Sequence, residues 1–220
     1  MNKFPGILGK KIGMTQIFDE KGEVLRCTVV QGGCVVVGKR TQEKDGYSAL
    51  IVGLGERKEK HTNKAVAGAF KKANQTPKRV VRELRGTAEW VAKFEVGQAL
   101  PLGDIFSEGQ FVDAQGTSRG RGFTGVVRRW SFAGGVQTHG THEYRRHGGS
   151  IGTNMTPGRT LPGLKMPGHY GAETVTAHNL KVSKILADEH LLLIEGAVPG
   201  PRNGIVLIRG AVKKNGGVKK

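Results

Sequence analysis

One stretch of 52 residues, 118–169, limits what this chain can fold into more than any other feature. It contains twelve glycines and three prolines, and its apolar residues recur at no fixed period. Ordering the backbone costs about 1–2 kcal/mol per residue, and such a stretch buries too little apolar surface to offset that cost. We therefore expect residues 118–169 to form a mostly irregular extension, ordered by a partner.

The positive charge of the chain is also uneven. The 220 residues carry a net charge of +17. Residues 118–169 hold eight basic side chains and one acidic one, Glu143, and residues 213–220 hold four lysines and no acid. Residues 1–117 carry only +6, and residues 170–212 are neutral. A surplus of this size predicts a polyanionic partner.

Nucleic acid and an anionic membrane are the two candidate polyanions. No apolar run approaches the roughly 18 residues that cross a bilayer, and residues 1–6 lack the apolar segment of a signal peptide. We therefore expect a cytoplasmic protein with a nucleic-acid partner and no membrane partner. Cys27 and Cys34 could form one disulfide, but two buried reduced thiols suit a cytosolic chain better.

Outside the extension, the sequence reads as short strands separated by turn signals. Residues 14–18 and 23–30 flank a turn at 19–22 whose glycine favours a hairpin. Thr62 is the expected N-cap of a short helix over residues 64–74. Further strands are predicted over residues 35–39, 47–52, 80–85, 96–99, 111–113, 175–179, 191–195 and 205–209.

Many short strands with turn signals favour a closed barrel or a sandwich over a parallel sheet. We expect a mainly β globular domain built from residues 1–117 and 170–212, with a helical insertion at about 62–75. The extension, residues 118–169, interrupts this domain, and residues 213–220 form a basic tail.

The side chains of the extension indicate the class of nucleic acid. Arginine matches phosphate oxygens bidentately, glycine allows close approach of the backbone, and aromatic rings stack on splayed bases. Folded RNA fits better than duplex DNA, because no recognition helix is apparent. A solvated basic loop is the alternative. The candidate RNA-binding residues of the extension are Arg119, Arg121, Arg128, Arg129, Trp130, His139, His142, Arg145, Arg146, His147, Asn154, Arg159, Lys165 and His169.

Lys10 and Lys11, beside Gly9 and Gly13, are two further candidates. They are expected to form a small basic turn, for which RNA contact and a solvated charge pair are equally plausible readings.

Two other patterns in the extension suggest different chemistry. Residues 120–125 match the dinucleotide-binding fingerprint G-x-G-x-x-G, but that motif requires a βαβ unit and the glycines at 134 and 135 disfavour a following helix. The histidines fit no standard zinc spacing. No catalytic arrangement of side chains is apparent, so we expect no catalytic residues, no metal, no cofactor and no small-molecule substrate.

Several motifs in order along the chain resemble the universal large-subunit ribosomal protein family number three, in its bacterial form. The motifs are residues 6–15, 116–123 with 128–130, 149–152 through 156–158, 165–169 and 192–200. The resemblance implies a Greek-key β-barrel of the translation-protein type, with a small helical insertion and a long extension toward the peptidyl transferase centre. It also implies binding to large-subunit rRNA near its 3′ domain, early action in assembly, and neighbouring large-subunit proteins as partners.

One feature of the family is missing from this sequence. Some bacterial members carry an N-methylated glutamine near the tip of the extension, whereas residues 153–155 here read Thr-Asn-Met. That modification is therefore not expected. A nucleoid-type DNA binder and a barrel enzyme acting on RNA are the rival classes; the first lacks a recognition helix and the second a catalytic constellation.

Overall fold

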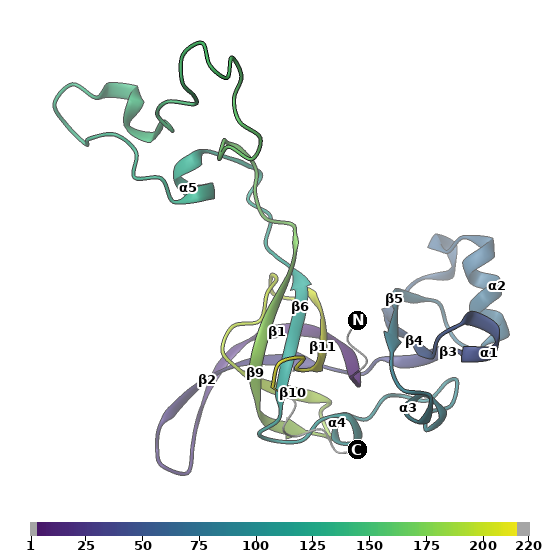
Figure 1. The fold of residues 1–220 in the computed structure, drawn as a ribbon. Helices are drawn as coiled ribbons and strands as arrows, with labels where there is room; N and C mark the ends of the chain where they lie inside the picture. Colours follow the sequence, from purple (N-terminus) through teal and green to yellow (C-terminus); the bar gives the residue numbers. More distant parts are fainter. Residues whose placement is uncertain (1–3, 215–220) are drawn as a thin grey trace. The chain divides into compact units, whose positions relative to one another are not determined.

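The structure is a computed structural model that describes residues 4–214. The chain divides into two compact units. The first, here called the barrel unit, comprises the chain up to Thr117 and from Thr174 onward; the second, here called the arm, is Ser118–Glu173. Figure 1 shows the strands and short helices of the barrel unit and the mostly irregular chain of the arm.

Six strands of the barrel unit close into an antiparallel barrel in the order β1-β11-β6-β9-β10-β2. They are β1 (Gly6–Phe18), β2 (Val24–Gln31), β6 (Phe111–Thr117), β9 (Thr174–Leu186), β10 (Leu191–Glu195) and β11 (Ile205–Gly210). Because β6 and β9 pair with each other on either side of the arm, the barrel needs both halves of the sequence. The predicted mainly β fold with a closed barrel is confirmed.

A second, three-stranded sheet in the order β3-β4-β5 belongs to the same unit. It consists of β3 (Val35–Arg40), β4 (Ala49–Glu56) and β5 (Lys78–Arg85). The short helices of this unit are α1 (Gln42–Asp45), η1 (Glu59–His61), α2 (Lys64–Lys72), α3 (Ala88–Ala92) and α4 (Leu102–Ile105). One continuous cluster of buried side chains joins the barrel to this sheet, including Ile208, Leu192, Leu50 and Leu84.

Several sequence predictions need correction. The helix is α2, but its N-cap is Asn63, whose side chain accepts from the N–H of Ala65, and not Thr62. The predicted strand over 96–99 is wrong: Gly97 has a left-handed φ of +95° in a turn, and only Ala99 makes a bridge, to Val35. The predicted basic turn at Lys10 and Lys11 is also wrong.

Lys10 and Lys11 lie inside β1, which begins at Gly6 rather than at residue 14. The pairing of β1 with β2 continues across the glycine-rich sequence because a β-bulge lies between Lys11 and Gly13. β9 likewise runs further than predicted, and the register between β6 and β9 shifts between Val112 and Ala114.

Asp113 is the buried acid at that shift, with its side chain 6% exposed. Its carboxylate accepts the backbone N–H of Asn179 at 2.9 Å and of Val212 at 3.1 Å, and it lies 3.2 Å from Nδ1 of His178. Burial alone would raise the pKa of Asp113, but these donors outweigh it and hold the pKa below its ordinary value. The carboxylate thus fastens β9 to the segment after β11.

Both cysteines are buried free thiols, as predicted from the sequence. Burial raises the pKa of Cys34 to about 11, so this thiol stays protonated at neutral pH. In the part of the chain that is described, no helix is long and apolar enough to cross a membrane.

Candidate nucleic-acid interface

The arm leaves the barrel on two paired chain segments. Thr117 at the end of β6 pairs with Thr174 at the start of β9, and inside the arm the N–H of Ser118 donates to the carbonyl of Glu173 at 2.8 Å. Further out, the two-residue strands β7 (Phe123–Thr124) and β8 (Gly168–His169) pair antiparallel. The base of the arm is therefore a narrow hydrogen-bonded stalk (Figure 1).

Glycine is required in this stalk. Gly171 has a φ of +75°, and a Cβ there would collide with the carbonyl oxygen of Arg119. The two segments can approach closely because this position carries no side chain.

Beyond the stalk, the short helix α5 (Val126–Trp130) ends at Ser131, which is left-handed with a φ of +60°. Nη1 of Arg129 and Nε1 of Trp130 both donate to the carbonyl of Met166, each at 2.8 Å. The Arg129 guanidinium lies 4.9 Å from the Trp130 ring centroid, and Nζ of Lys165 lies 5.8 Å from it. These cation–π contacts and hydrogen bonds hold α5 against the chain segment that contains Lys165 and Met166.

A second short helix, η2 (His142–Arg146), packs against the loop that follows α5. The N–H of Gly135 donates to the carbonyl of Arg145 at 2.9 Å, and a Cβ on Gly134 would collide with the same oxygen. The rings of Tyr144 and His147 lie 4.8 Å apart. Backbone contacts, rather than an apolar core, thus hold this part of the arm.

The outer segment, residues 150–160, is a chain of turns. The Ser150 hydroxyl donates to the carbonyl of Gly152 at 2.9 Å, and the Thr153 hydroxyl donates to that of Thr156 at 2.8 Å. Asn154 and Arg159 are among the exposed residues that line a shallow hollow here. This segment presents side chains and backbone to its surroundings.

The arm keeps few residues from solvent. Its buried residues are Thr124, Val126 and Gly171. Among the described residues, sixteen large hydrophobic side chains are exposed, and nine of them belong to the arm, including Phe123 at 79% and Met155 at 86%. Concentrations of exposed apolar side chains are typical of interaction sites in proteins.

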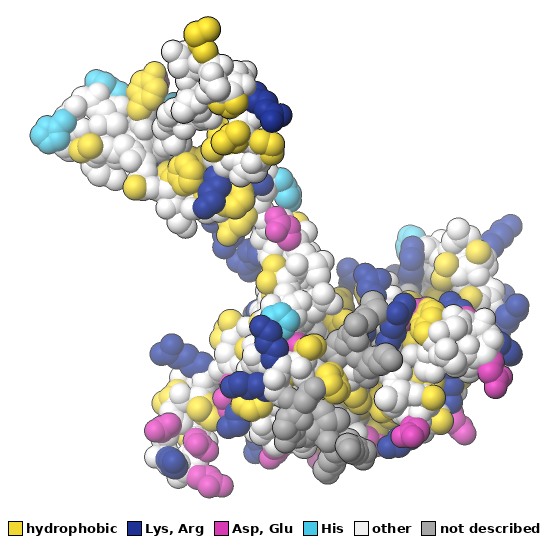
Figure 2. Space-filling model, in the orientation of Figure 1, with side chains coloured by type: hydrophobic (Ala, Val, Ile, Leu, Met, Phe, Trp, Pro, Cys, Tyr) yellow, Lys and Arg dark blue, Asp and Glu magenta, His cyan; other side chains and the backbone are white. Residues whose placement is uncertain are grey.

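Fourteen of the sixteen predicted RNA-binding residues lie in the arm, and thirteen of these are exposed. Arg129 is the half-buried exception. Figure 2 shows lysine, arginine and histidine side chains on the visible face of the arm. The remaining two, Lys10 and Lys11, belong to the barrel unit, where Nζ of Lys11 donates to the carbonyls of Val198 at 2.7 Å and Gly200 at 3.2 Å.

The structure adds two things that the sequence did not reveal. Arg129 and Trp130 hold the arm together internally, through a backbone carbonyl that no side-chain pattern could identify. The helix α5 also exists, although the glycines after it were expected to prevent one. It does not complete a dinucleotide site, because the strand before it, β7, has two residues and pairs antiparallel with β8.

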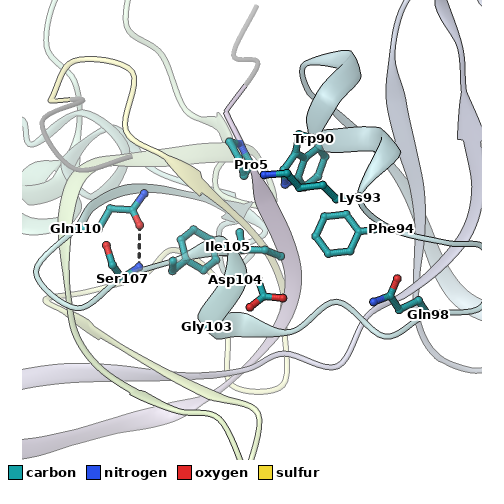
Figure 3. A pocket seen from close by; sticks show the side chains of 11 residues that line it. Pro5, Trp90, Lys93, Phe94, Gln98, Gly103, Asp104, Ile105, Ser107 and Gln110 are labelled. Carbon is teal, nitrogen blue, oxygen red and sulfur yellow. Dashed lines mark hydrogen bonds between the residues drawn. The ribbon is translucent and has the colours of Figure 1, made fainter. Parts of the chain in front are cut away.

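The barrel unit contains a pocket of about 410 Å3 (Figure 3). Trp90, Phe94 and Ile105 form its apolar walls, and its charged side chains are Lys93 and Asp104. The polar contact drawn inside it is the backbone N–H of Ser107 donating to Oε1 of Gln110 at 3.0 Å. This set holds no nucleophile–base pair. Across residues 4–214, no cluster of three or more His, Cys, Asp or Glu side chains could hold a metal ion.

Comparison with known proteins gives one consistent family. The model of the family "Ribosomal protein L3" matches residues 64–190. The chain is 74% identical to large ribosomal subunit protein uL3 of Sorangium cellulosum over 217 residues, covering 99% of this chain and 94% of that protein. It is 51% identical to uL3 of Myxococcus xanthus and 48% identical to uL3 of Brachyspira hyodysenteriae, each over 210 residues and more than nine-tenths of both chains.

Proposed function

The chain belongs to the ribosomal protein L3 family, the uL3 proteins of the large ribosomal subunit, and from that premise we propose that its arm binds large-subunit rRNA directly. As a ribosomal protein of this family it is a structural, non-enzymatic constituent of the large subunit. The finer proposal is that residues 118–169 penetrate folded rRNA, while residues 1–117 and 170–212 form the globular domain and 213–220 a basic tail. Lys219 and Lys220 of this tail lie outside the described residues.

One observation carries the proposal. The extension combines eight basic residues and one acid with a surface that exposes apolar and aromatic side chains instead of burying them. Arginines can neutralise phosphates, and exposed rings and aliphatic side chains can contact unpaired bases. A free solvated loop would gain nothing from exposing Phe123, Met155 and Leu161 together.

The arm residues then divide by role. Arg119, Arg121, Arg128, Arg145, Arg146, Arg159 and Lys165 are proposed phosphate ligands, and His139, His142, His147, Asn154 and His169 are proposed contacts to bases or sugars. Arg129 and Trp130 act as positioning residues, because the carbonyl of Met166 accepts from both. Lys10 is a weaker candidate in β1, and the bonds of Lys11 to Val198 and Gly200 make a positioning role in the barrel the better proposal for it.

The resemblance to the family supports three further parts of the proposal. The protein acts early in large-subunit assembly near the 3′ domain of the rRNA, its extension supports the peptidyl transferase centre, and neighbouring large-subunit proteins contact it. The cytoplasmic ribosome is the proposed location.

Affinity measured as a function of salt tests the RNA proposal. Full-length protein should bind large-subunit rRNA fragments more tightly than duplex DNA of equal length. Replacing Arg128, Arg145, Arg146 and Arg159 by glutamine should reduce the slope of log affinity against log salt by about 3, at roughly 0.7–0.9 per phosphate contact. Equal affinity for rRNA and DNA would contradict the proposal.

Deleting the outer arm tests the division into domains. Removing residues 125–165 leaves the stalk pairing of β7 with β8 in place. The barrel should then unfold at an unchanged temperature, while incorporation into particles or peptidyl transfer weakens. Cooperative loss of the whole fold would show that the arm is part of the core and that the division is wrong.

A further inference from the structure

A second concentration of positive charge lies in the barrel unit. Residues 57–85, here called the basic segment, carry ten Lys and Arg and two Glu, a net charge of +8 in 29 residues. The remainder of residues 1–117 carries nine basic and eleven acidic side chains, a net charge of −2. The mild +6 of residues 1–117 is therefore an average over two unlike parts, and the basic segment is denser in charge than the arm.

The basic segment is one excursion of the chain followed by a strand. Glu56 of β4 pairs with Lys78 of β5, and the N–H of Arg57 donates to the carbonyl of Pro77 at 2.9 Å, so the connection closes at its stem. This connection contains η1 and α2. Its exposed cations, with those of β5, are Arg57, Lys58, Lys60, Lys64, Lys71, Lys72, Arg79 and Arg82. Figure 2 shows lysine and arginine side chains gathered over this part of the barrel unit.

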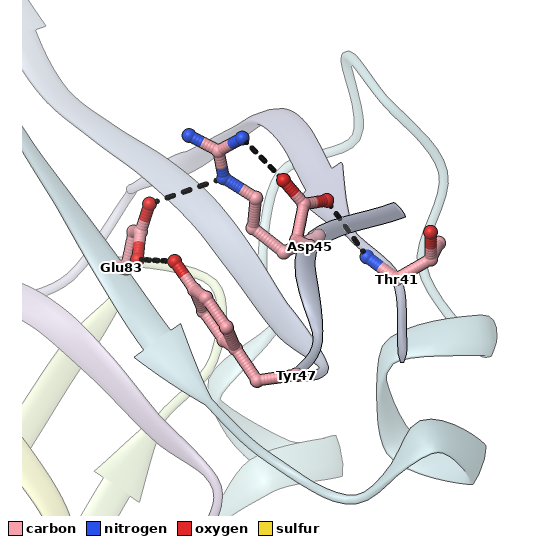
Figure 4. Close-up of polar contacts among 5 residues, drawn as sticks. Thr41, Asp45, Tyr47 and Glu83 are labelled. Atoms are coloured by element: carbon pink, nitrogen blue, oxygen red, sulfur yellow. Dashed lines mark hydrogen bonds and ion pairs between the residues drawn. The ribbon is translucent and has the colours of Figure 1, made fainter. Parts of the chain in front are cut away.

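These cations are not neutralised by neighbouring acids. In the adjacent cluster drawn in Figure 4, Arg40 pairs with Asp45 at 2.7 Å and with Glu83 at 3.2 Å, and the Tyr47 hydroxyl donates to Glu83 at 2.8 Å. Glu83 is thus already engaged by groups outside the basic segment. Within residues 4–214, none of the eight exposed cations lies within 4.0 Å of a carboxylate oxygen.

The composition of this surface favours RNA phosphates over a protein partner. Phe70 is the segment's one Phe, Tyr or Trp residue, and it is buried. Among its apolar side chains only Val66 is a large exposed one. Protein interfaces are enriched in aromatic residues and depleted in lysine, whereas phosphate contacts need only cations. The surface can neutralise phosphates but offers no ring for stacking on bases.

We propose that residues 57–85 bind the sugar–phosphate backbone of helical RNA, as a second contact separate from the arm. The inference goes beyond the proposed function, which rests on the arm. The contact is insensitive to sequence, because phosphates carry no base identity, and it depends strongly on salt. Through this contact the globular domain binds an RNA helix, while the arm binds irregular RNA.

The test compares two full-length variants with the same change of charge. In the first, Lys64, Lys71, Lys72 and Arg79 are replaced by glutamine. In the matched control, four exposed cations elsewhere in the barrel unit, Lys21, Lys44, Lys93 and Arg202, are replaced by glutamine. The probes are a perfect RNA hairpin duplex of about 16 base pairs, the same duplex with scrambled sequence, and a large-subunit rRNA fragment. Thermal unfolding confirms that both variants fold.

We expect the first variant to bind both duplexes at least tenfold more weakly at moderate salt, with a salt slope lower by about 3. The control should lose less than threefold. Equal losses in the two variants would mean that only net charge matters, and would overturn the proposal. Unchanged RNA affinity of the first variant would also overturn the proposal. If that variant kept its RNA affinity but failed to enter the large subunit, the partner of the basic segment would be a protein.

The arm variant with Arg128, Arg145, Arg146 and Arg159 replaced by glutamine separates this inference from the proposed function. If only the arm variant loses rRNA affinity, the second contact is wrong and the arm proposal stands. If only the basic-segment variant loses it, the arm proposal fails and the second contact stands.

Discussion

The barrel and the arm are stabilised in different ways. The barrel unit buries a continuous apolar cluster that includes Ile7, Leu192 and Ile208 at 0% exposure. The arm, in which Thr124 and Val126 carry the buried side chains, is held by hydrogen bonds to carbonyls and by glycines that permit close approach. Burying apolar surface is the main driving force for folding, so we expect the barrel to fold without the arm, whereas the arm leaves its side chains exposed for the RNA contact proposed above. Substitutions can therefore separate stability from binding.

The largest expected effect is on the barrel core. Leu192→Ala in β10 removes a fully buried side chain and should lower the free energy of unfolding by about 2–5 kcal/mol. Leu161→Ala in the arm, where the side chain is 63% exposed, should change it by less than about 0.5 kcal/mol. Urea unfolding followed by circular dichroism measures both. Similar losses of unfolding free energy in the two variants would show that the barrel and the arm do not differ in how far apolar burial stabilises them.

The second-largest effect on stability should come from a buried polar group of the barrel, the carboxylate of Asp113. Asp113→Asn keeps the shape of the side chain but removes the charge that accepts from Asn179 and Val212, and should cost about 1–3 kcal/mol at pH 7. Because the pKa of Asp113 is lowered in the folded state, its contribution is complete above the unfolded value of about 4. It is lost as the pH falls through the lower folded pKa.

Wild-type protein should therefore lose stability below about pH 4 more steeply than Asp113→Asn does. Unfolding midpoints in urea measured from pH 3 to pH 7 check this. The exposed Asp188→Asn is the matched control and should follow the wild type. Parallel pH profiles for wild type and Asp113→Asn would show that the carboxylate does not fasten β9.

Substituting a glycine in the arm should weaken RNA binding without changing the global stability of the protein. Alanine at Gly134, where φ is +78°, would be strained and would meet the carbonyl oxygen of Arg145, so η2 must shift. We expect rRNA affinity to fall about tenfold, which corresponds to about 1.4 kcal/mol, while the melting temperature stays unchanged. Gly152→Ala has open space and an ordinary φ, and should bind as the wild type does. A lower melting temperature for Gly134→Ala would couple the arm to the barrel.

Sequence reasoning succeeded where a pattern is local or periodic. The hairpin of β1 and β2 follows from the glycine-containing turn at residues 19–22, and the arm follows from its glycines and charge. It failed where distant residues decide the structure. The bulge that keeps Lys11 in β1 depends on pairing with β2. The hydrogen bonds donated by Arg129 and Trp130 are accepted by the carbonyl of Met166, 37 and 36 residues further along the chain. The basic segment was missed because charge was averaged over 117 residues, and counting in shorter windows finds it.

The smallest effect should come from Trp130→Phe, which keeps an aromatic ring but removes the donor to Met166. If Trp130 positions the arm, losing one hydrogen bond should cost about 0.5–1.5 kcal/mol, a roughly two- to tenfold loss of rRNA affinity. If the ring instead stacks on a base, phenylalanine should preserve most of the affinity, because every aromatic face can stack. Arg129→Lys, which removes the planar guanidinium over the ring, should show a similar modest loss only in the first case. Filter binding to an rRNA fragment at fixed salt resolves the two, and full affinity in both variants would place Trp130 among the RNA-stacking residues of the arm.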